Sequence, residues 1–559
     1  MPRRGGQAHV ATIRTKGKGG TIYTSYLLRR SYREGGKVKH ENSGTSRTSR
    51  PRWGFEIERS LPHGHVAAVL GVLRSLDLER LLSRERSRER DLCVAMICQL
   101  VIGPCSKLSM TRRFQQTTIS DELGLGEVTE PELLGAMDWL LDRQDRVERT
   151  LARRHLAEGS FVLYDLSSSY VEGRCCELAA LGHNRDGKPG KLQVNWGLVC
   201  SPEGRPIAVQ VHPGNTADPT TVPGVLDTVR ETFGIDRVIL VGDRAMITDA
   251  HAQAIKELGA GFVSALKTAQ IRKLINGGEL QLSLFDQTNL AEITSPEFEG
   301  ERLVVCRNPQ LAAERARKRE ELLQATEREL DKVSQMVSGP RGSLRNADAG
   351  KIGQRAGRVI NKYKVAKHFD LAIVDGSFSY QRNTEQIAAE AALDGIYVIR
   401  TTCPTDELTT QAVVRVYKQL KMAERAYRTI KDALEVRPIR HHLQQRVESH
   451  LFLFLLAYHL LFELQQRLAP MLYTDDTPLA PTDPVAPAKR SPDANKKAST
   501  HRTPDGLPAY DLPDLIAELG TICRNHLHIA ERAHTFPRLT TPNTVQAKAL
   551  ALLDIKLAA

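Results

Sequence analysis

Short apolar runs between residues 159 and 267 place the strongest constraint on the fold of this chain. Five runs predict strands, at 161–165, 192–200, 206–211, 237–243 and 262–266, and two patterns between them predict helices, at 219–233 and 248–258. The first and fourth strands each end in a single aspartate, Asp165 and Asp243. A buried strand that ends in one Asp brings its carboxylate to the rim of the sheet, where ligands usually bind in open α/β folds. We therefore expect an α/β fold in which the two aspartates lie close together.

A third acid, surrounded by cations, lies near residue 420. Tyr417, Glu424 and Lys431 are spaced seven residues apart. Arg428 follows Glu424 by four residues. Side chains at these spacings share one face of a helix, so the pattern predicts a single helix here. One acid among cations suits a site that handles phosphate groups, and this glutamate is a candidate to converge with the two aspartates.

This arrangement resembles the DDE transposases of bacterial insertion sequences, in particular the IS-four-like superfamily. The signature of that superfamily is a Tyr, two residues, an Arg, three residues, a Glu, six residues and a Lys. The matching positions are Tyr417, Leu420, Glu424 and Lys431, so a leucine occupies the Arg position and Lys421 beside it is the cationic substitute. The resemblance covers roughly residues 160–460. It implies a ribonuclease-H-like catalytic core, which the predicted order of strands and helices matches.

The resemblance also implies that Asp165, Asp243 and Glu424 are the catalytic residues and the metal ligands. Hard oxygen ligands select Mg²⁺ or Mn²⁺. Cutting and joining DNA uses two such ions about 4 Å apart, and we expect Asp165 to bridge the two ions of each active site. Seven residues are expected to contact DNA, with the tyrosine packing or contacting a phosphate: Tyr417, Lys421, Arg428, Lys431, Arg185, Lys188 and Lys191.

Each acid also has a plainer interpretation. Asp243 could end its strand by bonding the next turn, and Glu424 could pair with the arginine four residues further on. Asp249 is an alternative second acid. Asp432 or Glu435 is an alternative third acid.

Two further questions stay open. The loop 182–193 carries three of the cations among glycines, and it could be a solvated hairpin turn at 186–187 as well as a clamp on DNA. Some relatives hold a flipped base on an aromatic residue when they form a DNA hairpin. That step stays undecided because no tryptophan lies in the insertion or beside the glutamate; the three are Trp53, Trp139 and Trp196.

The function that the resemblance implies is a DNA transposase. Such an enzyme cleaves at terminal inverted repeats and joins the 3′ ends to target DNA, and we expect a homodimer bound to double-stranded DNA. The net charge of +12 favours a polyanionic partner. One alternative is a ribonuclease-H-like nuclease that does not join strands. The other is a non-catalytic DNA-binding regulator derived from a transposase.

Composition and pattern divide the chain into segments. The first fifty residues carry twelve Lys or Arg against two Glu, with glycine turns between strand-like stretches. The insertion contains a charged helix with Asn308 as its cap and Leu323, Leu330 and Val337 at heptad spacing. We expect a basic β-hairpin arm over 1–55, a helical domain that binds DNA ends over 56–158, the catalytic core over 159–267 and 393–468, a large insertion before the Glu-bearing helix over 268–392, a disordered linker over 469–508 and a helical tail over 509–559.

The remaining sequence features predict a cytoplasmic bacterial protein close to the nucleoid. The nine cysteines form no C-x-x-C pair and are expected to be reduced core residues. No run reaches the roughly 20 apolar residues of a membrane span, so no membrane partner is expected. The apolar run 451–458 predicts a buried helix.

Overall fold

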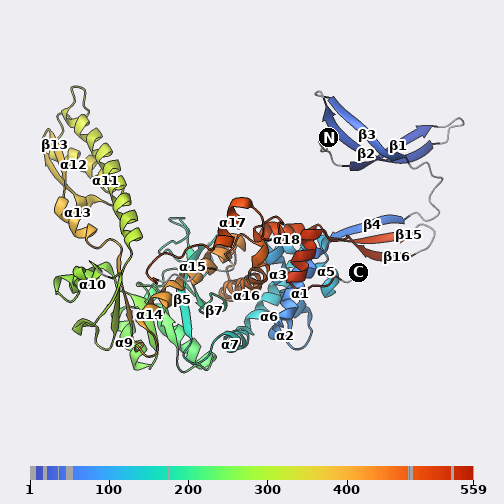
Figure 1. Cartoon of the computed structure of the whole chain (residues 1–559), viewed down its shortest axis with the longest axis horizontal. Helices are drawn as coiled ribbons and strands as arrows, with labels where there is room; N and C mark the ends of the chain where they lie inside the picture. The colour runs from blue at the N-terminus through green and yellow to red at the C-terminus, as the bar shows by residue number, and fades with distance from the viewer. Residues whose placement is uncertain are drawn as a thin grey trace. The chain divides into compact units, whose positions relative to one another are not determined.

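The computed structural model describes residues 8–16, 22–34, 37–45, 55–173, 175–286, 288–475, 478, 483–529 and 534–557. These residues fall into two compact units (Figure 1). The smaller unit is built from described residues within 1–61 and 522–541, and the larger unit from those within 62–521 and 542–557.

The smaller unit contains two three-stranded sheets. The first joins β1 (Ala8–Lys16), β2 (Ile22–Glu34) and β3 (Lys37–Thr45) in that order. The second has the order β16-β15-β4, from β4 (Phe55–Pro62), β15 (Cys523–Ile529) and β16 (His534–Leu539). The prediction of a helical tail over 509–559 is therefore wrong for this part of the chain. An isolated hairpin is marginally stable, and the third strand that supports it comes from the other end of the sequence.

The larger unit is organised around a mixed sheet with the strand order β10-β11-β14-β9-β8-β5-β6-β7. Strand β8 pairs in parallel with β5 and β9, and all the other pairs are antiparallel. The strands are β5 (Phe161–Tyr170), β6 (Gln193–Cys200), β7 (Pro206–Pro213), β8 (Ile239–Val241), β9 (Gly261–Ala265), β10 (Leu290–Ile293), β11 (Arg302–Arg307) and β14 (Ile396–Thr401). The helices α8 (Val222–Asp227) and α9 (Asp249–Glu257) flank β8 in sequence, so the α/β prediction is confirmed.

Two details of the sheet differ from the prediction. Strand β5 does not end at Asp165, because the serine-rich residues that follow continue to pair with β6 as far as Tyr170. The predicted insertion over 268–392 also contributes to the main sheet, since β10 and β11 extend it beyond β14. The core beneath these added strands includes Leu303, Val305 and Val398, which are fully buried.

The later part of the insertion, from residue 309 onward, is a small helical and β layer with its own core (Figure 1). Helix α11 (Pro309–Ser338) begins as predicted, with the Asn308 side chain accepting hydrogen bonds from the backbone N–H groups of Gln310 and Leu311. Its heptad residues, of which Leu330 is fully buried, pack in the same cluster as residues of α12 (Ala349–Ile360) and of the hairpin formed by β12 (Phe369–Val374) and β13 (Ser377–Arg382). Helix α13 (Thr384–Ala391) follows the hairpin, whereas α10 (Thr268–Asn276) packs in the core of the main sheet.

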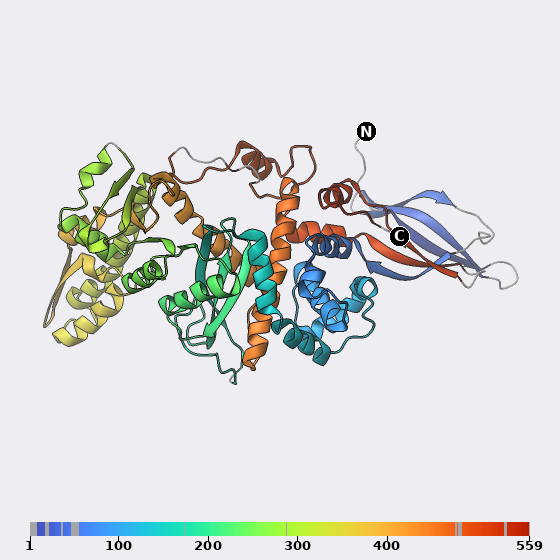
Figure 2. The same ribbon diagram turned by 90° about the horizontal axis from the view of Figure 1, so that it is seen from below.

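The helical pattern before the sheet forms a compact layer. Its helices are α1 (Gly64–Ser75), α2 (Leu78–Leu82), α3 (Arg88–Ile102), α4 (Lys107–Gln116), α5 (Ile119–Leu123), α6 (Glu130–Leu141) and α7 (Gln144–His155). Helix α16 (Gln444–Leu468) packs against α3 and α6 on one side and β7 on the other (Figure 2, orange). Helix α16 therefore lies at the centre of the packing between the N-terminal helices and the sheet.

One helix among the described residues, Gln444–Met471, is long and apolar enough to cross a membrane, and 89% of its apolar window is buried in the protein. Helices α3 and α4 together pass the same test but are bent by 86° where they meet. The expectation that no segment reaches this length is therefore wrong by length and composition. The packing of α16 against α3, α6 and β7 explains why its sequence is so apolar.

The segment predicted as a disordered linker contains ordered structure in its described part. Helix α17 (Pro492–Thr500) lies within it, and the Lys497 side chain donates hydrogen bonds to the carbonyls of Ala469 and Thr474. The Lys418 side chain donates to the carbonyls of residues 484–486. Polar contacts of this kind order a segment with little apolar content, and composition alone does not reveal them. Helices α18 (Leu512–Gly520) and α19 (Thr544–Leu552) follow.

Candidate active site

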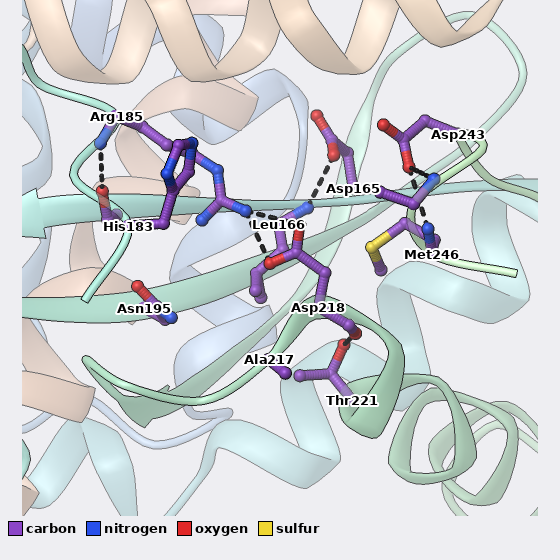
Figure 3. Close-up of polar contacts among 12 residues, drawn as sticks. Asp165, Leu166, His183, Arg185, Asn195, Ala217, Asp218, Thr221, Asp243 and Met246 are labelled. Atoms are coloured by element: carbon purple, nitrogen blue, oxygen red, sulfur yellow. Dashed lines mark hydrogen bonds and ion pairs between the residues drawn. The ribbon is translucent and has the colours of Figure 1, made fainter. Parts of the chain in front are cut away.

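The register of β5 and β8 brings the two predicted aspartates together. Leu163 lies opposite Val241 in this parallel pair, and each aspartate follows two residues later in its own segment. Parallel strands with this register carry the two side chains to the same edge of the sheet. Figure 3 shows the Asp165 and Asp243 side chains next to each other.

Backbone hydrogen bonds hold each aspartate in place. Oδ1 of Asp165 accepts a hydrogen bond from the N–H of Leu166 at 2.8 Å. Oδ1 of Asp243 accepts from the N–H groups of Ala245 at 2.8 Å and Met246 at 2.9 Å (Figure 3). One carboxylate oxygen of each residue is thus held by the protein's own backbone, which fixes how the side chain is presented.

The three acids act on one another electrostatically. The pKa of Asp165 is raised to about 7, first by burial and then by the negative charges of Asp243 and Glu424, against the opposing effects of the Leu166 hydrogen bond and Arg185. Glu424 is exposed, and within the described part of the chain it makes no hydrogen bond or ion pair. The alternative in which Glu424 pairs with Arg428 is therefore not what the structure shows.

The segment that carries Glu424 was predicted to be one continuous helix, and the structure shows that it is not. It consists of α14 (Thr410–Lys418), α15 (Leu420–Arg428) and a π-helical turn, η6 (Thr429–Ala433). The break lies at Gln419, where the N–H of Gln419 bonds to the carbonyl of Val416 and the N–H of Met422 bonds to the carbonyl of Gln419. The seven-residue spacing of the signature residues therefore spans an interruption between two helices. Lys421 and Arg428 are exposed, as is Glu424 between them.

A tyrosine that the sequence analysis did not identify anchors α15 to the sheet. Tyr427 is 5% exposed, its hydroxyl accepts a hydrogen bond from the N–H of Leu198 at 2.7 Å, and it donates to the backbone carbonyl of Asp165. Its ring packs on Trp196 at a centroid distance of 4.8 Å. Tyr427 lies three residues after Glu424, so this contact ties the helix of the third acid to the strand of the first.

Lys431, a predicted DNA contact, is largely buried in an ion pair. Only 8% of its side chain is exposed, and its Nζ lies 2.7 Å from Oδ1 of Asp186, whose side chain is 1% exposed. Arg437 pairs with the same oxygen. The second oxygen of Asp186 accepts a hydrogen bond from the N–H of Tyr170 at the end of β5. This buried network, which we call the Asp186 network, joins the loop 182–193, β5 and η6.

The three predicted DNA-binding cations of the loop 182–193 lie in different environments. Arg185 forms an ion pair with Asp218 at 2.5 Å, and its backbone N–H bonds to the hydroxyl of Ser168 (Figure 3). Lys188 and Lys191 are exposed. The loop is therefore a braced structure that presents two exposed lysines, rather than a solvated turn centred on residues 186–187.

Tyr417 lies close to the acids and is half-buried. Its pKa is raised to about 12, first by burial and then by the charges of Asp243 and Glu424, with Arg244 acting in the opposite direction. The structure thus brings this signature tyrosine to the carboxylates even though the helix is broken after it.

Two of the three alternative acids are engaged elsewhere. Asp249 begins α9 and pairs with Arg400 at 2.5 Å. Asp432 pairs with Arg437 at 2.6 Å. Neither is among the groups that shift the pKa of Asp165, whereas Asp243 and Glu424 both are.

Comparison with known families identifies the class of protein that this site defines. The model of the transposase DDE domain family matches residues 168–460, more than half of the 559 residues, and the chain therefore belongs to this family. It is a DDE transposase, an enzyme that acts on DNA. The match includes Asp243 and Glu424 and begins three residues after Asp165.

Two other comparisons were made with known proteins. No curated protein matches the chain. Among solved structures, a similar chain is that of the piggyBac transposase in a synaptic complex with hairpin DNA, with 8% identity and a TM-score of 0.34, covering 82% of this chain and 76% of that one.

DDE transposase domains depend on metal ions, and the chemistry of the three acids fits that requirement. Their donors are carboxylate oxygens, the ligands that Mg²⁺ and Mn²⁺ prefer. The mutual repulsion that raises the pKa of Asp165 is the kind that a bound cation relieves. Among the described residues, however, no three His, Cys, Asp or Glu side chains are placed as a group that could hold a metal ion. The acids are neighbours rather than a closed set of ligands.

Proposed function

We propose that this protein is an IS-four-like transposase that cleaves DNA at terminal inverted repeats and transfers the 3′ ends into target DNA. The strands β7-β6-β5-β8-β9 would form its ribonuclease-H-like core, and Asp165, Asp243 and Glu424 its catalytic acids. The observation that carries this proposal is the parallel register of β5 and β8, which aligns Asp165 with Asp243. The effect of Glu424 on the pKa of Asp165 supports its place in the same site.

In this proposal the three carboxylates hold two Mg²⁺ or Mn²⁺ ions. Bound there, the ions would activate water or a 3′ hydroxyl and stabilise charge at phosphorus during in-line displacement. The protein's own contribution is placement. Tyr427 fixes the strand of Asp165 against the helix of Glu424. The backbone N–H groups after Asp243 orient its carboxylate.

The exposed cations near the acids would bind the DNA backbone. Lys421 and Arg428 lie before and after Glu424 on α15, and both are exposed. Lys188 and Lys191 extend from the braced loop. Phosphate contacts of this kind position DNA without reading its sequence. Arg185 and Lys431 would act less directly, because Asp218 and Asp186 already hold them.

The proposed assembly is a homodimer on double-stranded DNA, working in the cytoplasm. Cleavage and transfer act on two element ends at once, which suits one active site for each end. All nine cysteines are free thiols, as a reducing compartment favours.

The test is strand cleavage and joining with Mn²⁺ on DNA that carries the repeats flanking the gene. The proposal predicts joined products with the wild-type protein and none with Glu424→Gln. Cleavage without joining by the wild type would support a nuclease instead. DNA binding without any cleavage, insensitive to metal and to Asp165→Asn, would support a regulator derived from a transposase.

A further inference from the structure

A cavity of about 430 Å³ lies between the N-terminal helices and the segment that leads from η6 into α16. Its walls come from α3, α4 and α6 on one side, and from residues 434–454 on the other. It is separate from the carboxylate site, since none of the three acids lines it. The two are linked through Arg437, which lines the cavity and pairs with Asp186.

The most unusual residue of the cavity is Lys107, the first residue of α4. It is 7% exposed, and within the described part of the chain its ammonium group makes no hydrogen bond or ion pair. Its Nζ lies 5.7 Å from the centre of the Phe454 ring, near the outer limit of a cation–π attraction. Burial lowers the pKa of Lys107 to about 8, and no carboxylate is among the groups that act on it. A buried ammonium group without a carboxylate partner is costly unless something else pairs with it.

A further donor without a hydrogen-bond partner belongs to Arg446, which also lines the cavity. Its Nε is buried and unpartnered among the described residues, while another nitrogen of the same guanidinium group lies 3.6 Å from a carboxylate oxygen of Asp138. Ser106 caps α4 by accepting a hydrogen bond from the N–H of Ser109, so the positive end of this helix lies at the wall. His441 lines the wall as well, with its ring 5.0 Å from that of His450.

The other charged residues that line the cavity are exposed or already paired. Its two carboxylates, Glu130 and Glu435, are exposed. Its arginines pair with carboxylates outside the lining: Arg437 with Asp186 and Asp432, Arg440 with Glu172, and Arg446 with Asp138. Lys107 is therefore the cation of the lining that has no carboxylate partner among the described residues, and an anion in the cavity would supply one.

We propose that this cavity binds a phosphate group, with Lys107 as its central contact and Arg446 and the start of α4 around it. A volume of about 430 Å³ is ample for a phosphate and leaves room for part of a nucleotide against the Phe454 side. The phosphate could belong to DNA or to a free anion such as inorganic phosphate or a mononucleotide. The inference does not depend on the three acids or on transposition.

The first experiment measures binding of inorganic phosphate by calorimetry at constant ionic strength, with chloride as the balancing salt. Loss of one charge-assisted contact costs about 1.5–3 kcal/mol, so Lys107→Met should weaken binding about tenfold or more. Arg112→Met is the matched control, because Arg112 is an exposed cation on the same helix that does not line the cavity. Equal affinity of the wild type and Lys107→Met would overturn the proposal, as would no binding by the wild type.

A second measurement needs no variant and so covers the case in which Lys107→Met does not fold. The wild-type protein is acetylated with and without inorganic phosphate, and the labelling rate of each lysine is followed by mass spectrometry. Phosphate should slow the labelling of Lys107 and leave that of exposed Lys188 unchanged. Equal labelling of Lys107 in both conditions would overturn the proposal. Competition of duplex DNA with phosphate at Lys107 would identify DNA as the source of the group, and its absence would identify a free anion.

Discussion

Substitution of Tyr427 by Phe tests how the helix of the third acid is attached to the strand of the first. The variant removes only the hydroxyl, while the ring can stay packed on Trp196 at its present centroid distance of 4.8 Å. The hydroxyl lies between the N–H of Leu198 and the carbonyl of Asp165, which face each other in the register of β5 and β6.

The magnitude follows from what the hydroxyl leaves behind. A typical hydrogen bond contributes about 1 kcal/mol net, and a buried donor left without a partner costs about 1–3 kcal/mol. Tyr427 is 5% exposed, so water cannot readily replace the hydroxyl at the N–H of Leu198. We therefore expect Tyr427→Phe to lower the free energy of unfolding by about 2 kcal/mol. The loosened link between Glu424 and Asp165 should also raise the Mn²⁺ concentration needed for half-maximal cleavage.

Urea unfolding and Mn²⁺ titrations of DNA cleavage measure the two effects. Tyr458→Phe is the control, because Tyr458 is also buried, on α16, and its hydroxyl makes no hydrogen bond within the described residues. This control should change stability by less than about 0.5 kcal/mol. The reasoning is refuted if Tyr427→Phe matches the wild type in both the urea midpoint and the metal requirement.

Two further predictions concern buried charges. Lys431→Met removes one of the two cations that pair with buried Asp186, so it should lower the free energy of unfolding by about 3 kcal/mol, whereas Lys188→Met at an exposed site should change it by less than about 0.5 kcal/mol; equal urea midpoints would contradict the structural role of Lys431. Burial raises the pKa of Glu148 to about 8 from its ordinary value of 4.5, so the folded state holds the extra proton and stability is lost as pH rises between these values, by at most about 1.4 kcal/mol per pH unit. Glu148→Gln should remove this loss, and unfolding curves of both proteins at pH 5 and pH 8 that differ by a constant amount would count against it.

The sequence predicted the elements of the central sheet better than their limits. All five predicted strands are present, because apolar runs bounded by turn residues are a local signal. The end of β5 was misplaced because Ser167, Ser168 and Ser169 pair with β6 despite their polarity, and that pairing depends on a strand over twenty residues away. Strands β15 and β16 were missed for the same reason, because the third strand of their sheet, β4, lies near the other end of the sequence.

The site was predicted in part. The aspartates could be paired from sequence because each follows a short apolar strand. The helix of Glu424 was recognised by its spacing, but the break at Gln419 carries no local signal such as Pro or Gly. Two residues were misjudged or missed because their partners are distant. Lys431 meets Asp186 across 245 positions of the chain, and Tyr427 meets Asp165 across 262. The one hint in the sequence is that Ala423 and Ile430 lie four residues before and three residues after Tyr427, which puts an apolar side chain above and below it on the same helix face.

The central claim is that Asp165, Asp243 and Glu424 form one active site. The most direct test is single-turnover cleavage of repeat-end DNA with Mn²⁺ by Asp165→Asn, Asp243→Asn and Glu424→Gln, each with its fold and DNA binding checked. Asp249→Asn and Glu435→Gln serve as controls at the alternative acids. The account predicts that the first three variants bind DNA but lose cleavage by about a thousandfold or more, while both controls cleave within a few-fold of the wild type. The account would be contradicted if any of the first three variants cleaved DNA as fast as the wild type, or if a control variant bound DNA but lost cleavage.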